Sequence, residues 1–169
     1  QDPQSEITII KVMSRGGKRS APLAKRGTAL LATRLTVEMP DTDKLRRLMH
    51  LGSTMMYHIE GDYSTVTIKS LSEHLEDTLK IVSGVIKDPL YSGLRIRNMK
   101  RYMEHMEKRL EDSPDHIAVQ ACLDAFFPGS EYGYAVSVYG NEKSRDAIKK
   151  RDVEAFYQQY FSRDNLEII

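Results

Sequence analysis

The residues in this sequence best suited to metal binding or acid–base chemistry are its histidines. They are His50, His58, His74, His105 and His116. Zinc peptidases commonly carry a His-Glu-x-x-His arrangement, or its inverse, because that spacing brings two imidazoles to one face of a helix. None of these histidines has either arrangement. Their spacing therefore predicts no zinc site of that kind.

Carboxylates adjoin two of the histidines, in Glu73-His74-Leu75-Glu76 and in Glu104-His105. Neighbouring residues of a helix point in different directions, so neither group can hold a metal ion without a ligand from a third element. A solvated helix surface explains both groups more simply. A metal site built from His74, His105 and Glu104 stays an alternative hypothesis.

Nucleophilic catalysis has equally little support. Cys122 lies on the apolar stripe of an expected helix, which indicates a buried, inert thiol rather than a nucleophile. No serine has the surroundings of a nucleophile elbow; those weighed are Ser20, Ser53, Ser64 and Ser137. The residues taken alone therefore predict no catalytic constellation.

Composition and charge are those of an ordinary globular domain. The chain has 169 residues, 40% of them hydrophobic and 29% charged, which suits one domain with a substantial core. The net charge is +1, so no overall field attracts nucleic acid or acidic membranes. No apolar run approaches the roughly 18 residues that a membrane span needs. The single cysteine excludes an internal disulfide and indicates no compartment.

A local excess of basic residues surrounds Gly16-Gly17. It consists of Arg15, Lys18, Arg19, Lys25 and Arg26. The glycine spacing does not match a phosphate-binding loop, and no aromatic residue is interleaved for base stacking. We therefore interpret this segment as a solvated loop and expect no nucleic-acid partner.

Strand signals occur in three places. Residues 7–12 form a nearly continuous apolar run rich in β-branched residues, which favours a strand covered on both faces. Residues 54–59 and 63–69 flank Gly61-Asp62, and the alternation in the second arm is typical of a β-hairpin. Residues 166–169 resemble the start of a further strand. Because a terminal strand without a partner would expose its backbone groups, we expect the chain to be a fragment of a longer subunit.

Six segments have the apolar spacing of helices: residues 24–37, 41–51, 72–88, 94–110, 113–126 and 152–161. Asp41 and Ser113 are expected to cap two of these helices, and Pro114 suits a first helical position. The core-facing residues expected on the second, fourth and fifth helices include Leu45, Leu48, Met49, Met99, Met103, Met106, Ile117, Ala121, Cys122 and Phe126. Helices and a hairpin together predict an α+β fold.

The order of these elements, together with seven short sequence segments, resembles the pitrilysin/insulinase family of zinc peptidases, which includes the mitochondrial processing peptidases. The segments are Lys25-Arg26-Gly27-Thr28-Ala29-Leu30-Leu31, Leu51-Gly52-Ser53, Leu71-Ser72-Glu73-His74-Leu75-Glu76, Lys87-Asp88-Pro89-Leu90, Glu111-Asp112-Ser113-Pro114, Phe126-Phe127-Pro128-Gly129 with Tyr132-Gly133, and Tyr160-Phe161-Ser162-Arg163-Asp164-Asn165-Leu166. The resemblance implies one metallohydrolase-type domain over residues 1–169. Its sheet should be largely antiparallel, with helices packed on one face.

Active members of that family carry an inverted His-x-x-Glu-His motif directly after the glycine that aligns with Gly27. On this alignment Leu30 and Arg34 replace the two histidine ligands, and Thr33 replaces the glutamate that activates water. The third ligand, a glutamate, would fall near Glu104 or Glu107. One carboxylate without imidazole partners is no zinc site, and Arg34 places a fixed positive charge where the metal would lie. The resemblance thus implies a zinc site that has been lost, and no cofactor.

Many members of the family work as pairs in which one half carries zinc and the other does not. The resemblance therefore implies a non-catalytic subunit that closes the chamber and helps to bind the peptide substrate. Its expected partner is a zinc-bearing subunit of the same family, in a hetero- or homodimer. Two alternatives stay open: an active zinc endopeptidase with a degenerate site, and a structural adaptor like the core subunits of respiratory complexes. The resemblance also favours the bacterial periplasm as the compartment.

Overall fold

The sheet of this protein is antiparallel and has four strands in the order β2-β3-β1-β4. A computed structural model describes residues 5–127 and 135–169. The strands are β1 (Ile7–Ser14), β2 (Thr54–Ile59), β3 (Ser64–Leu71) and β4 (Leu166–Ile168). Strands β2 and β3 form the predicted hairpin, and Glu60 N donates to Tyr63 O across Gly61-Asp62 at 2.8 Å. Strand β4 pairs with β1, which confirms the strand expected near residue 166.

One face of the sheet is covered and the other is open. In β3, Val66 and Ile68 are buried, and their partners in β1 are Val12 and Ile10. On the opposite face of β1, Ile9 is 55% exposed. The prediction that this strand is covered on both faces is therefore wrong. The apolar run of β1 hides the alternation, because isoleucines occupy the solvent face as well as the core face.

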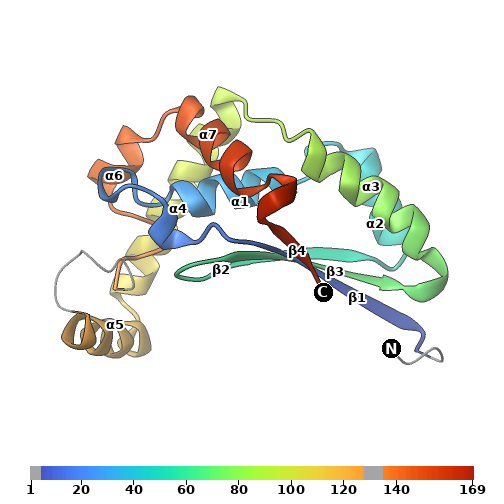
Figure 1. Ribbon diagram of the computed structural model, residues 1–169. Helices are drawn as coiled ribbons and strands as arrows, with labels where there is room; N and C mark the ends of the chain where they lie inside the picture. The colour runs from blue at the N-terminus through green and yellow to red at the C-terminus, as the bar shows by residue number, and fades with distance from the viewer. Residues whose placement is uncertain (1–4, 128–134) are drawn as a thin grey trace.

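The helices lie in one layer above the covered face of the sheet, apart from α5 (Figure 1). They are α1 (Thr28–Val37), α2 (Thr42–His50), α3 (Leu75–Lys87), α4 (Gly93–Glu111), α5 (Pro114–Phe126), α6 (Glu142–Ala147) and α7 (Lys150–Tyr160). Helix α1 lies at the centre of this layer and contacts α3, α4, α7 and the hairpin strands. The predicted α+β fold, with an antiparallel sheet and helices on one face, is confirmed.

Local sequence signals set several helix ends. Asp41 caps α2 by accepting from the backbone N–H groups of Asp43 and Lys44, as predicted. Ser113 accepts from His116 N, and Pro114 is the first residue of α5. Helix α6 was not predicted, because six residues rich in charge carry no apolar period.

The expected burial of α5 is wrong. None of its residues is buried; Ile117 is 54% exposed, Phe126 is 81% exposed, and the Cys122 thiol is exposed rather than packed in a core. Helix α5 projects from the end of α4 away from the main helical layer (Figure 1). Its apolar spacing was a true helix signal, but periodicity does not say whether another element covers the apolar face.

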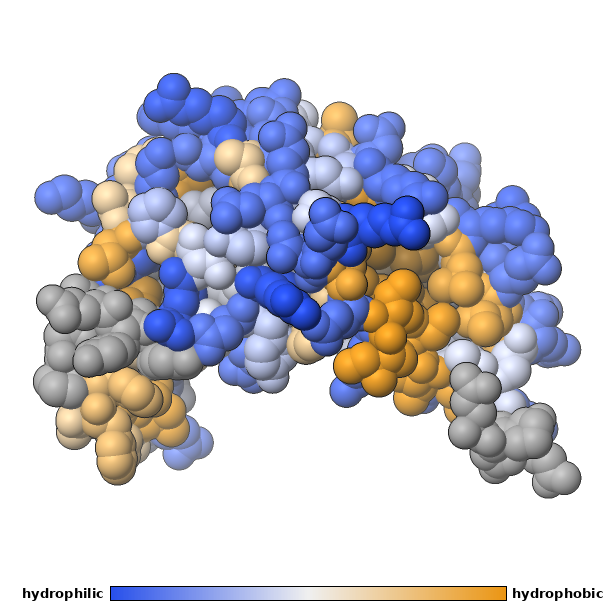
Figure 2. Space-filling model, viewed as in Figure 1, coloured by the Kyte–Doolittle hydropathy of each residue, from blue (hydrophilic) through white to orange (hydrophobic). Residues whose placement is uncertain are grey.

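The core is built around α1, α4 and α7. Met99 and Met103 of α4 belong to it, as predicted, whereas Met106 and Leu110 are half-buried. On α2 only Leu48 is buried; Leu45 and Met49 are exposed, contrary to expectation. Apolar residues also gather on the surface near the chain ends, over β1 and β4, where Ile168 and Ile169 are exposed (Figure 2). Within the described residues, no helix is long and apolar enough to cross a membrane.

Candidate functional site around Arg34

Helix α1 begins at a residue that only glycine fits. Gly27 has a φ of +97°, in the left-handed region where a side chain is strained. A Cβ there would lie 2.5 Å from Met103 Cε and 3.1 Å from the Tyr139 carbonyl oxygen. The missing side chain therefore lets the start of α1 approach both α4 and the segment before α6.

Helix α1 is buried on every side except at Arg34. Leu31 and Ala32 are fully enclosed, Leu30 is only 4% exposed, and all other residues of the helix except Arg34 are buried as well. A helix buried on nearly all sides belongs inside a domain rather than on its surface. Arg34 is the charged residue of this central helix and its one residue that is not buried.

The Arg34 guanidinium lies against tyrosine rings. Its Cζ is 3.8 Å from the centre of the Tyr102 ring on α4, which is cation–π geometry. Burial raises the pKa of Tyr57, on β2, and the nearby Arg34 charge opposes that rise. Burial also raises the pKa of Tyr139, which faces the same group. The raised pKa values of Tyr57 and Tyr139 favour their neutral forms, so these two side chains stabilise the cation through dipoles rather than through charge.

Thr33 carries the second unusual polar group of α1. Its side chain is fully buried, and its hydroxyl has no hydrogen-bond partner among the described residues. Thr36, one turn later, contrasts with it, because that hydroxyl bonds to the Ala32 carbonyl at 2.7 Å and to the Tyr91 hydroxyl at 2.6 Å. A buried hydroxyl without a partner costs stability. Thr33 thus offers neither a carboxylate nor a solvated oxygen that could activate water.

The two glutamates named as possible third ligands lie in different environments on α4. Glu104 is exposed and pairs with Lys108 at 2.7 Å; this hydrogen bond and the lysine charge lower the Glu104 pKa. Glu107 instead pairs at 2.6 Å with Arg145, whose side chain is only 5% exposed. Arg145 also donates to the carbonyl oxygens of Tyr139 and Gly140, at 3.3 Å each. Glu107 is therefore already engaged by a buried cation.

These residues do not fit a zinc ion. Leu30 has no donor atom, Arg34 is permanently positive, and the half-buried carboxylate of Glu107 is paired with an arginine. Across the described ranges, no group of three His, Cys, Asp or Glu side chains is close enough to share a metal ion. The alternative ligand set of His74, His105 and Glu104 is thus not brought together. No catalytic step can be built on a metal held by these side chains.

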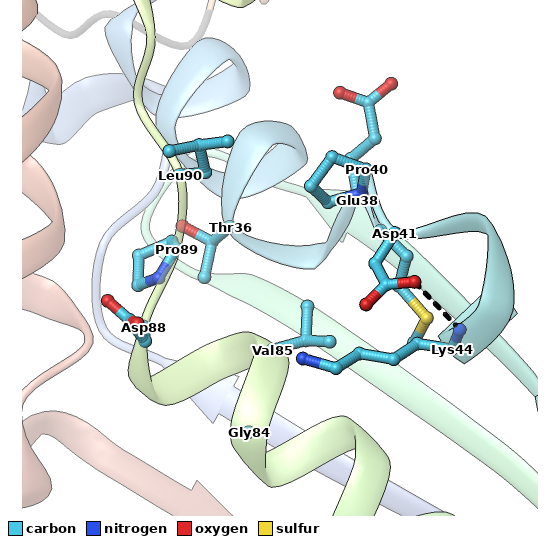
Figure 3. A pocket seen from close by; sticks show the side chains of 11 residues that line it. Thr36, Glu38, Pro40, Asp41, Lys44, Gly84, Val85, Asp88, Pro89 and Leu90 are labelled. Atoms are coloured by element: carbon cyan, nitrogen blue, oxygen red, sulfur yellow. Dashed lines mark hydrogen bonds between the residues drawn. The ribbon is translucent and has the colours of Figure 1, made fainter.

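Two cavities adjoin the C-terminal end of α1. The smaller one, of about 100 Å³, lies between α1, α2 and α3, with Thr36, Lys44 and Asp88 on its walls (Figure 3). Asp41 is held there by its capping bond to Lys44 N (Figure 3). The larger cavity, of about 300 Å³, shares the segment 38–40 with it and reaches Arg34. The positively charged side chain of Arg34 therefore borders the larger cavity.

The three tyrosines around Arg34 were not predicted from the sequence. Tyr57, Tyr102 and Tyr139 come from a strand, a helix and a connecting segment, so no spacing links them. The available signal was Arg34 itself, the single charge in an otherwise uncharged helix. That signal indicates a special environment, but the neighbours follow only from the packing of α4 and β2 against α1.

The sequence matches no protein-family profile and no curated protein. The structure is similar to the peptidase M16 inactive domain from Pseudomonas fluorescens, with a TM-score of 0.84 and 18% identity over 98% of this chain and 41% of that chain. It is also similar to pitrilysin, with a TM-score of 0.79 and 12% identity over 99% of this chain and 19% of that chain. A chain of Complex III2 from Candida albicans gives a TM-score of 0.73 and 14% identity over 99% of this chain and 38% of that chain. This chain spans less than half of each of these structures. The chain therefore has the fold of the pitrilysin and M16 peptidase domains, as the sequence resemblance implied.

Proposed function

We propose that this chain is a non-catalytic domain of a pitrilysin-type peptidase, which closes the chamber and helps to hold a peptide for a zinc-bearing partner. The observation that carries the proposal is the trio Leu30, Thr33 and Arg34 at the positions that the family motif assigns to two ligands and a base. The fold shared with an M16 inactive domain supports it. The engagement of Glu107 by Arg145 supports it as well, because a ligand carboxylate would have to be free.

Peptide binding draws support from the shape of the sheet. Strand β2 is an outer strand of the described sheet, so one row of its backbone groups lacks a strand partner. Such an edge accepts an extended peptide as an additional strand. Tyr57 lies on β2 next to Arg34, so a peptide at this edge would pass close to the residues of the candidate site. The open sheet face provides the surface toward which a partner domain could close.

Metal analysis of the purified chain is the most direct test of the missing catalytic role. We expect no stoichiometric zinc after dialysis against about micromolar free zinc. Zinc retained at one ion per chain would contradict the proposal. The variant Arg34→His serves as a reference, because one imidazole added beside Leu30 and Thr33 should still not create a site.

The partner requires a separate experiment. A tagged chain should co-purify with a protein whose sequence contains an intact His-x-x-Glu-His motif, and the complex should cleave peptides that neither protein cleaves alone. Removal of zinc from the partner should abolish cleavage. Full activity of the partner without this chain would refute the supporting role. Cell fractionation tests the compartment, for which we propose the periplasm.

A structural adaptor is the second candidate, favoured by the similarity to a chain of Complex III2. An adaptor would also be recovered in a stable assembly, but the assembly would contain no intact zinc motif and would show no peptide hydrolysis. The same co-purification therefore separates the two functions. Hydrolysis that depends on this chain would exclude the adaptor.

A further inference from the structure

Within the part of the chain that the structure describes, no carboxylate forms an ion pair with Arg34, unlike the more deeply buried Arg145. Arginine–carboxylate pairs among the described residues involve Arg15, Arg19, Arg46, Arg95 and Arg145. Arg34 is half-buried, and among the described residues its contacts are with Tyr57 and Tyr102 rather than with a carboxylate. A partly desolvated guanidinium is compensated only in part by ring faces. An anion that reached Arg34 would therefore meet a fixed cation with unused binding capacity.

The space next to Arg34 is large enough for a small organic group. The cavity of about 300 Å³ is bounded by α1, the segment after it and one face of α4. The α4 residues on its wall are Arg95, Asn98, Met99 and Tyr102, which recur at helical spacing. Because α4 and α1 belong to the core of the domain, the walls are held in place by tertiary packing.

Two arginines line this cavity among the described residues, and of the two only Arg95 forms an ion pair there. Arg95 also lines it, but Glu38 binds Arg95 at 3.0 Å, and Arg95 further donates to the carbonyl oxygens of Leu35 and Glu38. Glu38 and Arg95 therefore neutralise each other. Among the described side chains of the cavity wall, Arg34 remains as the positive charge without a carboxylate partner, and it could neutralise a monovalent anion.

The remaining wall atoms indicate an organic ligand. Asn98 is exposed and lines the same cavity as Arg34, where it supplies an amide donor, whereas Met39, Pro40 and Met99 form an apolar side. A planar guanidinium and a neighbouring amide suit the two oxygens of a carboxylate. The apolar side suits the carbon atoms attached to that carboxylate.

We propose that this cavity binds an organic carboxylate, with its oxygens on Arg34 and Asn98 and its apolar part against Met39 and Met99. The ligand chemistry is that of a peptide chain end or of an acidic side chain. The proposal deepens the peptide-binding role above, but the binding itself needs only this chain. Failure to find a zinc-bearing partner would therefore leave it intact.

The test is a titration of the isotope-labelled full chain, followed at the arginine Nε–Hε signals by nuclear magnetic resonance. N-acetyl-leucine carries a free chain-end carboxylate, and N-acetyl-leucinamide is its neutral counterpart. We expect saturable shifts at the Arg34 signal with the acid and none with the amide. N-acetyl-glutamate α-amide presents the carboxylate on a side chain, so the tighter of the two acids identifies the source.

Two matched arginine variants test whether the acid binds at Arg34. Arg34→Gln should weaken binding of the preferred acid at least tenfold, whereas Arg101→Gln should leave it unchanged, because Arg101 is exposed on α4 and does not line the cavity. Circular dichroism and thermal unfolding establish that both variants are folded. Met99→Ala gives a second readout, because it should reduce the preference for N-acetyl-leucine over acetate.

Four outcomes would overturn the proposal. They are equal binding of the acid and the amide, equal loss in the two arginine variants, binding of inorganic phosphate as tight as that of the acids, and no saturable binding up to about 10 mM acid. Each of these can occur whether or not the chain has a peptidase partner.

Discussion

The ion pair between Glu107 and Arg145 gives the sharpest test of how α4 is fixed to the rest of the domain. In the variant Glu107→Gln, the carboxylate is replaced by a neutral amide of nearly the same shape. Arg145, only 5% exposed, then keeps its bonds to the Tyr139 and Gly140 carbonyls but loses its counter-ion. The variant should therefore be destabilised without losing its fold.

The magnitude follows from the burial of the two partners. Removal of one partner of a fully buried ion pair costs about 3–5 kcal/mol. Glu107 is 23% exposed, and two carbonyl oxygens continue to bind Arg145, so we expect a loss of about 2 kcal/mol. For a domain of this length such a loss lowers the midpoint of thermal unfolding by about 4–8 °C.

Urea unfolding followed by circular dichroism measures the change, and Glu104→Gln is the matched control. Glu104 lies on the same helix but is exposed, and its partner Lys108 is exposed too, so its removal should cause no measurable change. In the double variant Glu107→Leu with Arg145→Met, only part of the lost stability should return, because no buried charge is left unpaired but the Tyr139 and Gly140 carbonyls lose their donor. Equal effects of Glu107→Gln and Glu104→Gln would refute the reasoning.

Two further predictions concern buried polar groups. Thr33→Val should stabilise the protein by about 1 kcal/mol, because it removes a buried hydroxyl without a partner, whereas Thr36→Val should cost about 1–2 kcal/mol through its lost bond to Tyr91. If urea unfolding showed that both variants change the free energy of unfolding in the same direction, this prediction would be wrong. Burial raises the pKa of Asp152, but the hydrogen bond from Lys25 Nζ and a backbone N–H outweigh burial and lower it. A lowered carboxyl pKa stabilises the fold above about pH 4, and this stability is lost as the pH falls through the lowered value. Asp152→Asn should therefore cost up to about 1 kcal/mol at pH 7 and progressively less in acid, and a cost independent of pH would exclude this account.

Elements defined by local signals could be predicted from the sequence. The cap at Asp41, the Ser113-Pro114 helix start and the hairpin around Gly61-Asp62 each depend on residues that touch within a few positions. The α+β class followed from them. The environments of these elements could not be predicted. The solvent face of β1 and the exposed α5 both have sequences that would suit a buried position.

The candidate site was predictable only in part. The family resemblance indicated Leu30, Thr33 and Arg34 as the positions of the site, together with a glutamate on the helix that is α4 in the structure. It could not indicate that Glu107 would meet Arg145, or that Tyr57 and Tyr102 would enclose Arg34, because these contacts join residues far apart in the chain. Such contacts depend on how helices pack on the sheet, which no local pattern encodes.

Helices α1 and α5 should differ in how readily they unwind. Every residue of α1 except Arg34 is buried, so we expect its amide hydrogens to exchange with solvent mainly when the whole domain opens. Helix α5 buries no residue, and among the helices it packs mainly against the end of α4, so it can unwind alone at little cost. In deuterated water the amides of α5 should therefore exchange long before those of α1. This result would show that α5 unwinds while the helix bearing Arg34 stays intact.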